Sequence, residues 1–321
     1  MKYIDIAHVN KRVSRIVCGT AAAPYNTGAD CNELLSGMLA LGVNVFDTAR
    51  VYGGAERALG RWISGCGVRE DIVLITKCCH PDIFGRRRVN ARAMRADLKR
   101  SLSLLNTGYV DIFLLHRDDP SVPAGELVEE LNALHAEGRI GAFGGSNWTY
   151  ARVAEANEYA YAHGLVPFAV SSPDFSLAVR ARDIWGGGES ISGTDMARVR
   201  RGYAENGIAV LAYSALARGL FSGKFSSGSE RAARAALDKY AVKGYLTQDN
   251  LARLARCEKL ARMKGVTVAQ IALAYVLCAQ PLSMAAVSCS RIARMEENAL
   301  AADMELSAEE ISYLEGGIAA Q

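Results

Sequence analysis

Residues 43–53 read Val-Asn-Val-Phe-Asp-Thr-Ala-Arg-Val-Tyr-Gly, an apolar run that ends at Asp47 and is followed by Tyr52. Two more apolar runs end in the same manner. Residues 72–77, Ile-Val-Leu-Ile-Thr-Lys, end at Lys77, and residues 110–116, Val-Asp-Ile-Phe-Leu-Leu-His, end at His116. Short runs rich in β-branched residues predict buried strands. Because strands of a parallel barrel direct their carboxyl ends to one mouth, these side chains predict a shared acid–base site.

Strand-like and helix-like segments alternate outward from these three runs. We expect eight strands near 15–18, 43–47, 72–77, 110–116, 140–146, 168–171, 208–213 and 284–288. Helical patterns follow each of them, for example across 150–162 and 291–302. Eight strand–helix units predict an α/β protein, a (β/α)8 TIM barrel. We expect one domain over residues 1–321.

Two segments stand outside this alternation. Residues 1–11 precede the first strand, and we expect a β-hairpin there, over the closed end of the barrel. Residues 215–248 form a long Gly/Ser-rich connection after the seventh strand, and extra helices at 250–264 and 267–279 follow it. A connection of that length inside a domain is usually functional or mobile.

The composition is that of an ordinary globular protein, with 50% hydrophobic and 22% charged residues. A net charge of +3 gives no reason to expect nucleic acid or a membrane as a partner. The longest apolar stretch, 266–279, is too short to cross a bilayer. The eight cysteines lack metal-ligand spacing, so we expect reduced thiols, no metal and a cytoplasmic protein. The oligomeric state stays open.

Asp47, Tyr52, Lys77 and His116 have the chemistry of a proton relay. A free phenol has a pKa of about 10, and a nearby ammonium lowers it. A carboxylate beyond the ammonium can hold the ammonium in position, and an imidazole can orient or polarise a carbonyl. The set lacks a nucleophile and an electron source, which indicates a bound redox cofactor.

With these residues in view, the chain resembles the aldo-keto reductase family. The similarity lies in residues 47–60, in Arg69 to Lys77, in 101–117 with Leu115-His116-Arg117, and in 138–148 with Gly145-Ser146-Asn147-Trp148. The resemblance implies NAD(P)H-dependent reduction of an aldehyde or ketone to an alcohol. It implies that Tyr52 protonates the carbonyl oxygen, Lys77 lowers the pKa of Tyr52, Asp47 pairs with Lys77 and His116 steers the substrate.

No Gly-x-Gly-x-x-Gly sequence follows the first strand, so a Rossmann site is not indicated. The resemblance implies a different cofactor cradle. It is formed by Thr20, Ser146, Asn147, Ser172, Tyr213, Leu216, Arg218, Gly219, Phe221, Lys224, Ser288, Ser290, Arg294, Glu297 and Asn298. Ser172 stands where the family usually has Gln. Arg294 matches a position that contacts the 2′-phosphate, which favours NADPH over NADH, although Ser288 and Cys289 replace a basic residue and a hydroxyl of some members.

The substrate is a small carbonyl compound whose identity the sequence leaves open. Candidate contacts are Tyr25, Arg117, Trp148 and Trp185. The polar run from Arg117 to Asp119 suggests a hydroxylated substrate such as a sugar aldehyde. Two other functions stay open. One is a catalytically slow, NADPH-binding regulatory subunit of the same fold. The other is a phosphate-binding barrel isomerase or lyase, because such barrels often bind phosphate after strands seven and eight.

Overall fold

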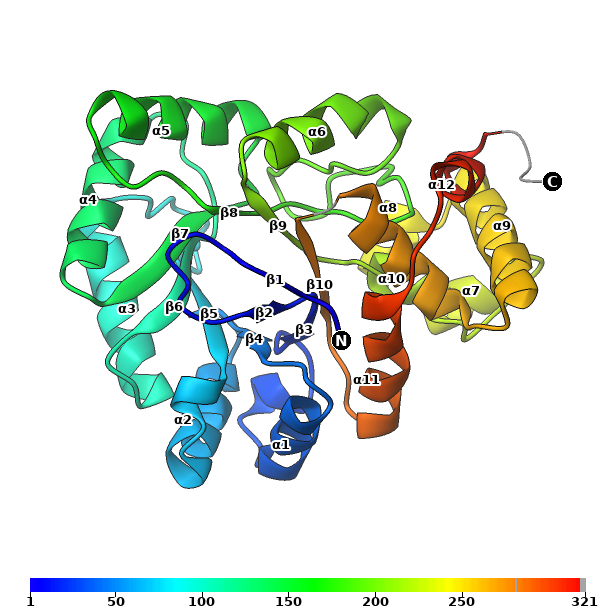
Figure 1. Ribbon diagram of the computed structural model, residues 1–321, viewed down its shortest axis with the longest axis horizontal. Coiled ribbons are helices and arrows are strands. Elements are labelled where there is room, and N and C mark those ends of the chain that lie inside the picture. Colours follow the sequence, from blue (N-terminus) through cyan, green and yellow to red (C-terminus); the bar gives the residue numbers. More distant parts are fainter. Residues whose placement is uncertain (281, 318–321) are drawn as a thin grey trace.

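The computed structural model describes residues 1–280 and 282–317. Within that part of the chain, eight parallel strands close a barrel in the order β10-β3-β4-β5-β6-β7-β8-β9, with β9 pairing back to β10. Helices surround the barrel, and the N-terminal segment crosses it (Figure 1). The predicted TIM barrel is confirmed.

The barrel strands are short and almost entirely buried. They are β3 (Ile16–Gly19), β4 (Val45–Asp47), β5 (Val73–Cys78), β6 (Val110–Leu115), β7 (Ile140–Ser146), β8 (Val170–Ser172), β9 (Ala209–Ala212) and β10 (Ser283–Val287). Alternate residues of each strand face two cores. One set, which includes Val45, Ile75 and Leu114, fills the barrel interior. The other set packs against the helices.

The helices follow the strands along the chain. They are α1 (Asn32–Ala40), α2 (Ala55–Cys66), α3 (Ala91–Leu105), α4 (Ala124–Ala136), α5 (Tyr150–Ala162), α6 (Ala197–Glu205), α7 (Glu230–Ala236), α8 (Lys239–Tyr245), α9 (Gln248–Lys264), α10 (Val268–Ala279), α11 (Ile292–Ala299) and α12 (Ala308–Glu315). Side-chain caps define several starts. Thr149 accepts from Arg152 N at α5, and Thr267 forms a capping box with Gln270 at α10.

The N-terminal hairpin closes one end of the barrel, as predicted. It consists of β1 (Tyr3–Ile4) and β2 (Val13–Ser14), which pair antiparallel. Ile6 and Val13 belong to the same buried cluster as the barrel interior. The amino ends of the barrel strands are therefore covered, and the carboxyl ends remain for a site.

The second half departs from expectation in one respect. The connection 215–248 is not a structureless loop, because it contains α7 and α8. In Figure 1 these helices lie with α9 at one side of the barrel. Among the described residues, no single helix is long and apolar enough to cross a membrane. Of the helix pairs in this part of the chain, only α9 and α10 are together long and apolar enough, and they are bent by 101°.

Candidate active site

The four predicted relay residues meet at the open mouth of the barrel. Asp47 ends β4, Lys77 is the penultimate residue of β5, and His116 directly follows β6. Tyr52 reaches the same place from the loop after β4. Since β4, β5 and β6 are neighbours in the barrel, their ends bring the side chains together.

Lys77 is the centre of this group. Its ammonium donates to Asp47 Oδ1 at 2.5 Å, to the Thr48 carbonyl oxygen at 3.0 Å and to the Tyr52 hydroxyl at 3.4 Å. The side chain of Lys77 is 3% exposed and that of Asp47 9%. An ion pair buried to this degree persists because each charge compensates the other.

The pKa values show what this pair does to Tyr52. Burial lowers the pKa of Lys77, but Asp47 and Tyr52 outweigh burial, so that pKa lies above its ordinary value. Burial raises the pKa of Tyr52 and Lys77 opposes this, with a net rise. Lys77 therefore acts on the pKa of Tyr52 in the expected direction, but burial, which is the largest influence, and the charge of Asp47 outweigh it. Tyr52 remains a neutral phenol at pH 7 and can donate a proton.

His116 stays neutral beside this group. Burial, then the positive charges of Lys77, His80 and Arg117, place its pKa well below the ordinary value of 6.5. Its ring meets the Tyr52 ring edge-on at 5.8 Å between centroids. Among the described residues, its Nδ1 atom is buried without a hydrogen-bond partner. A neutral imidazole with a free nitrogen can bind a carbonyl oxygen or a hydroxyl.

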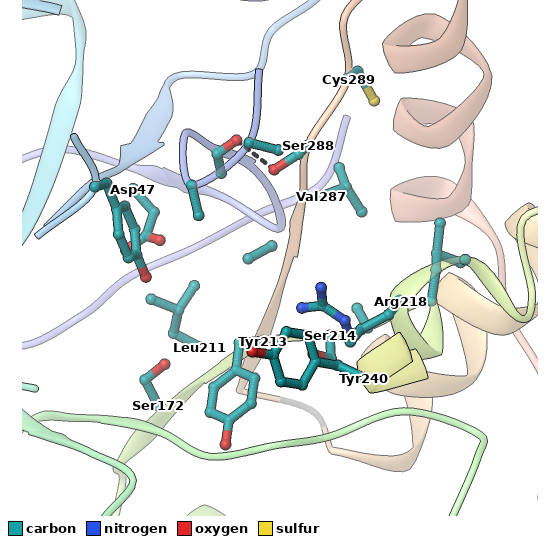
Figure 2. Close-up of a pocket in the computed structure, with 18 of the residues that line it drawn as sticks. Asp47, Ser172, Leu211, Tyr213, Ser214, Arg218, Tyr240, Val287, Ser288 and Cys289 are labelled. Atoms are coloured by element: carbon teal, nitrogen blue, oxygen red, sulfur yellow. Dashed lines mark hydrogen bonds between the residues drawn. The ribbon is translucent and has the colours of Figure 1, made fainter. Parts of the chain in front are cut away.

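A cavity of about 770 Å³ opens over the four residues. Asp47 and Ser172 lie at one side of it, Arg218 and Tyr240 at another, and Ser288 and Cys289 directly after the end of β10 (Figure 2). Of the predicted contacts, these line the cavity: Asp47, Tyr52, Lys77, His116, Arg117, Ser146, Asn147, Ser172, Trp185, Tyr213, Leu216, Arg218, Gly219, Lys224, Ser288, Ser290, Arg294 and Asn298.

The wall from β7 to β9 is a connected set of polar side chains. Tyr213 donates to Asn147 Oδ1 at 2.7 Å. The Asn147 amide nitrogen donates to the His116 carbonyl oxygen and to Ser146 Oγ, both at 3.1 Å. Ser146 in turn donates to the Ser172 carbonyl oxygen at 3.2 Å. This wall is therefore fixed relative to His116 before any ligand binds.

One part of the cavity wall was not predicted from the sequence. Trp185 and Tyr240 stack at 5.8 Å between ring centroids. The Arg218 guanidinium lies over both rings and pairs with Asp238 at 2.7 Å. Asp238 and Tyr240 were not predicted because they approach the mouth only through the fold of α8. Ala217 and Arg218 both have positive φ, which directs the chain across the cavity.

Two predicted substrate contacts need correction. Tyr25 is fully buried and donates to the Cys289 carbonyl oxygen at 2.6 Å, beneath the cavity wall. Trp148 is also fully buried. Its ring packs against Gly145, in the space that a side chain there would fill, and its centroid lies 5.3 Å from that of the Phe168 ring. Both side chains support the wall and do not line it.

Three predicted cofactor contacts also lie outside the cavity lining. Thr20 is buried and donates to the Asp47 carbonyl oxygen at 2.9 Å, so it positions Asp47. Phe221 is fully buried in the core. Glu297 pairs with Arg294 at 2.9 Å. A spacing pattern could not separate these supporting residues from those that face the cavity.

A family model described as the aldo/keto reductase family matches residues 15–318. The chain belongs to the aldo/keto reductase family. This membership indicates an oxidoreductase, which disfavours the isomerase or lyase alternative, and aldo-keto reductases use nicotinamide cofactors. The predicted resemblance is thereby confirmed.

Three relatives illustrate the range of this family. A norsolorinic acid reductase of Emericella nidulans is 28% identical, over 89% of this chain and 71% of its own length. A probable voltage-gated potassium channel subunit beta of Arabidopsis thaliana is 29% identical, over 95% and 92%. An L-glyceraldehyde 3-phosphate reductase of Escherichia coli O157:H7 is 27% identical, over 87% and 81%.

The cavity fits a dinucleotide. Buried polar atoms without a partner in the described residues include His116 Nδ1 at the relay, and Ser222 Oγ and Asn298 Oδ1 near the other end. Lys224, Arg291 and Arg294 also line the cavity, with Arg291 at the start of α11 and Arg294 within it, and these cations can balance phosphate charge. The polar atoms and the cations of the lining together suit a nicotinamide dinucleotide.

Proposed function

We propose that this protein is an NADPH-dependent carbonyl reductase that converts an aldehyde or ketone to an alcohol. The arrangement that carries the proposal is the neutral Tyr52 phenol, 3.4 Å from the buried Lys77 ammonium and beside the unpartnered His116 nitrogen. It gives a proton donor and a carbonyl-binding group in one cavity. Family membership supplies the reaction class.

Different residues of the chain bind the carbonyl group, transfer the proton and hold the cofactor. A bound nicotinamide supplies the hydride that the carbonyl carbon accepts. The His116 imidazole or the hydroxyl of Tyr52 binds the carbonyl oxygen, and Tyr52 transfers its proton to that oxygen as charge develops there. Lys77 stabilises the phenolate that remains, and Asp47 holds Lys77 in place. Ser146, Asn147 and Ser172 would hold the carboxamide of the cofactor, with Tyr213 against its ring.

The finer points of the proposal rest on particular residues. Arg294 lines the cavity near α11 and would bind a 2′-phosphate, so NADPH is preferred over NADH. A sugar aldehyde is the proposed substrate, a choice supported by the Escherichia coli relative that is named as a glyceraldehyde 3-phosphate reductase. We propose that the protein acts in the cytoplasm and that its substrate is a small carbonyl compound.

Cofactor binding and turnover test the proposal together. NADPH and NADH are titrated against the purified protein by quenching of intrinsic fluorescence, and NADPH oxidation is then followed with a panel of aldoses and apolar aldehydes. We expect tighter binding of NADPH and turnover of at least part of the panel. Binding of neither nucleotide would refute the proposal. Turnover of long apolar aldehydes in preference to aldoses would reject the sugar assignment.

A second function is a slow NADPH-binding regulatory subunit. The likeness to a potassium channel subunit beta over 95% of the chain supports it. A single-turnover experiment separates the two functions. Protein loaded with NADPH is mixed with excess aldehyde. Rapid oxidation of the bound NADPH supports the reductase, whereas tight binding with negligible oxidation supports the regulatory subunit.

A further inference from the structure

Arg117 follows His116 directly and lines the substrate side of the cavity together with Tyr52, His80 and Trp185. The guanidinium therefore belongs to the same cavity as the relay residues, and its charge acts to lower the pKa of Tyr52, His116 and Tyr213. The relay described above does not use this cation.

The guanidinium has little to compensate its charge. It is half-buried and, among the described residues, donates one hydrogen bond, from Nη1 to the Gly187 carbonyl oxygen at 3.3 Å. In the described part of the chain, no carboxylate forms an ion pair with it. Asp183, the carboxylate whose charge most raises the pKa of Arg117, pairs with Arg180 at 3.5 Å. A guanidinium has five donors in a planar fork, so most of them remain for a ligand.

The neighbouring acids are committed elsewhere. Asp118 lies 3.4 Å from Arg152, and Asp119 pairs with Arg87 at 2.8 Å and accepts from Ser121 Oγ at 2.7 Å. Neither lines the cavity. Of the polar run from Arg117 to Asp119, only the cation therefore faces the substrate.

We propose that Arg117 binds an anionic group of the substrate, so that the preferred substrates are aldehydes or ketones that carry a carboxylate or a phosphate. This inference rests on the proposed reductase function and narrows its substrate class. The planar fork of arginine matches both oxyanions in a bidentate manner. Partial burial strengthens the interaction, because fewer water molecules screen the charges.

Arg117 could instead serve only to hold the glycine-rich segment 186–188. That segment packs against the wall from β7 to β9, because a Cβ atom added at Gly188 would lie 2.8 Å from Asn147 Oδ1. Asp183 also holds the segment, by accepting from Trp185 N at 2.9 Å and from Gly187 N at 2.5 Å. A purely structural role would affect charged and neutral substrates equally, and Asp183 provides a matched control.

Matched substrate pairs test the inference. One pair is 4-formylbenzoate and its neutral methyl ester, and the other is glyceraldehyde 3-phosphate and glyceraldehyde. The quantity measured is the ratio of kcat/KM for the anionic member to that for the neutral member. We expect a ratio above one for at least one pair in the wild type. The pair that shows it identifies the oxyanion as a carboxylate or a phosphate.

Arg117→Met should lower this ratio about tenfold to a hundredfold, the loss expected for a charge-assisted hydrogen bond. Arg117→Lys, which keeps the charge but loses the fork, should lower it less. Asp183→Asn should change both members of a pair by a similar factor. An unchanged ratio in Arg117→Met, or a wild-type ratio at or below one for both pairs, would overturn the inference.

Dissociation constants for the same pairs, measured with NADP⁺ present, test the anion site at Arg117 independently of the proposed reductase activity. If the wild type reduces none of the four compounds, the proposed function fails. Tighter binding of the anionic members that depends on Arg117 would still support the anion site, and equal binding of both members would reject it.

Discussion

The two ends of β6 carry two charged clusters that are built differently. At the covered end, Asp111 accepts from Leu74 N at 2.8 Å and pairs with Arg69 at 2.8 Å and Lys11 at 3.1 Å. At the open end, Lys77 pairs with Asp47, while the Nδ1 atom of His116 has no partner in the described residues. The covered cluster is satisfied internally, whereas the open cluster leaves capacity for a ligand.

Because of this difference, the effect of a substitution on the free energy of unfolding can be separated from its effect on activity. Removing one member of either buried ion pair should destabilise the fold, because the other charge remains buried. Removing a group that lies outside these ion pairs, such as the Tyr52 hydroxyl, should cost little stability and much activity.

Lys77→Met should have the largest effect, because Lys77 serves both purposes. We expect kcat/KM for carbonyl reduction to fall about a hundredfold to ten-thousandfold. The free energy of unfolding should fall by about 3 kcal/mol, since Asp47 loses its partner. Turnover assays and urea unfolding measure the two. Lys99→Met, at an exposed position on α3, is the control and should change neither. Full activity in Lys77→Met would contradict the relay.

Asp111→Asn should lower the free energy of unfolding by about 3 kcal/mol, because two partly buried cations lose a buried carboxylate. Since Asp111 lies at the covered end, kcat/KM per folded molecule should stay within about twofold of the wild type. Urea unfolding and active-site titration with NADPH measure the two quantities. A large loss of kcat in fully folded protein would show that the two ends of β6 are not separable.

The sequence predicted the open cluster better than its surroundings. Asp47, Lys77 and His116 are predictable because a strand end fixes where a side chain points. Tyr25 and Trp148 lie in segments that are equally close to the mouth, yet both side chains are fully buried. The Trp148 ring packs against Gly145, where a larger residue would leave no room for it. Local spacing does not determine which face of a loop packs inward.

The connection 215–248 shows the same limit at a larger scale. Its glycines and serines predict a loop, but α7 and α8 form within it and bring Tyr240 onto Trp185. This contact joins residues far apart in the sequence, so it depends on the closed barrel. Arg218, by contrast, was predicted to face the cofactor and does line the cavity.

The neutral state of His116 predicts a pH effect on stability. Its folded pKa lies well below 6.5, so below pH 6.5 the unfolded chain binds a proton that the folded chain does not. The stabilisation is complete above pH 6.5 and is lost as the pH falls toward the folded pKa, by at most about 1.4 kcal/mol per pH unit.

Urea unfolding of the wild type and His116→Gln between pH 8 and pH 5 measures this effect. The difference between the two free energies should be constant above about pH 6.5 and should shift against the wild type below it. A parallel pH dependence of the two proteins would mean that His116 is not held neutral.

Arg294→Ala should have the smallest effect. We expect the KM for NADPH to rise about tenfold, because a charge-assisted contact with the 2′-phosphate is lost. The KM for NADH and the free energy of unfolding should change little. Glu297→Ala is the matched control, since it releases Arg294 from its ion pair and should leave NADPH binding equal or tighter. Equal losses for NADPH and NADH would remove the assigned preference.

Tyr52→Phe tests the central claim most directly, because it removes one oxygen atom that lies 3.4 Å from Lys77 and leaves the buried ion pair intact. The measurement is kcat/KM for NADPH-dependent reduction, with the urea unfolding midpoint recorded on the same preparation. We predict a loss of at least about a hundredfold in kcat/KM, with an unfolding midpoint close to that of the wild type. Retained turnover in the folded variant would contradict the assignment of Tyr52 as the proton donor.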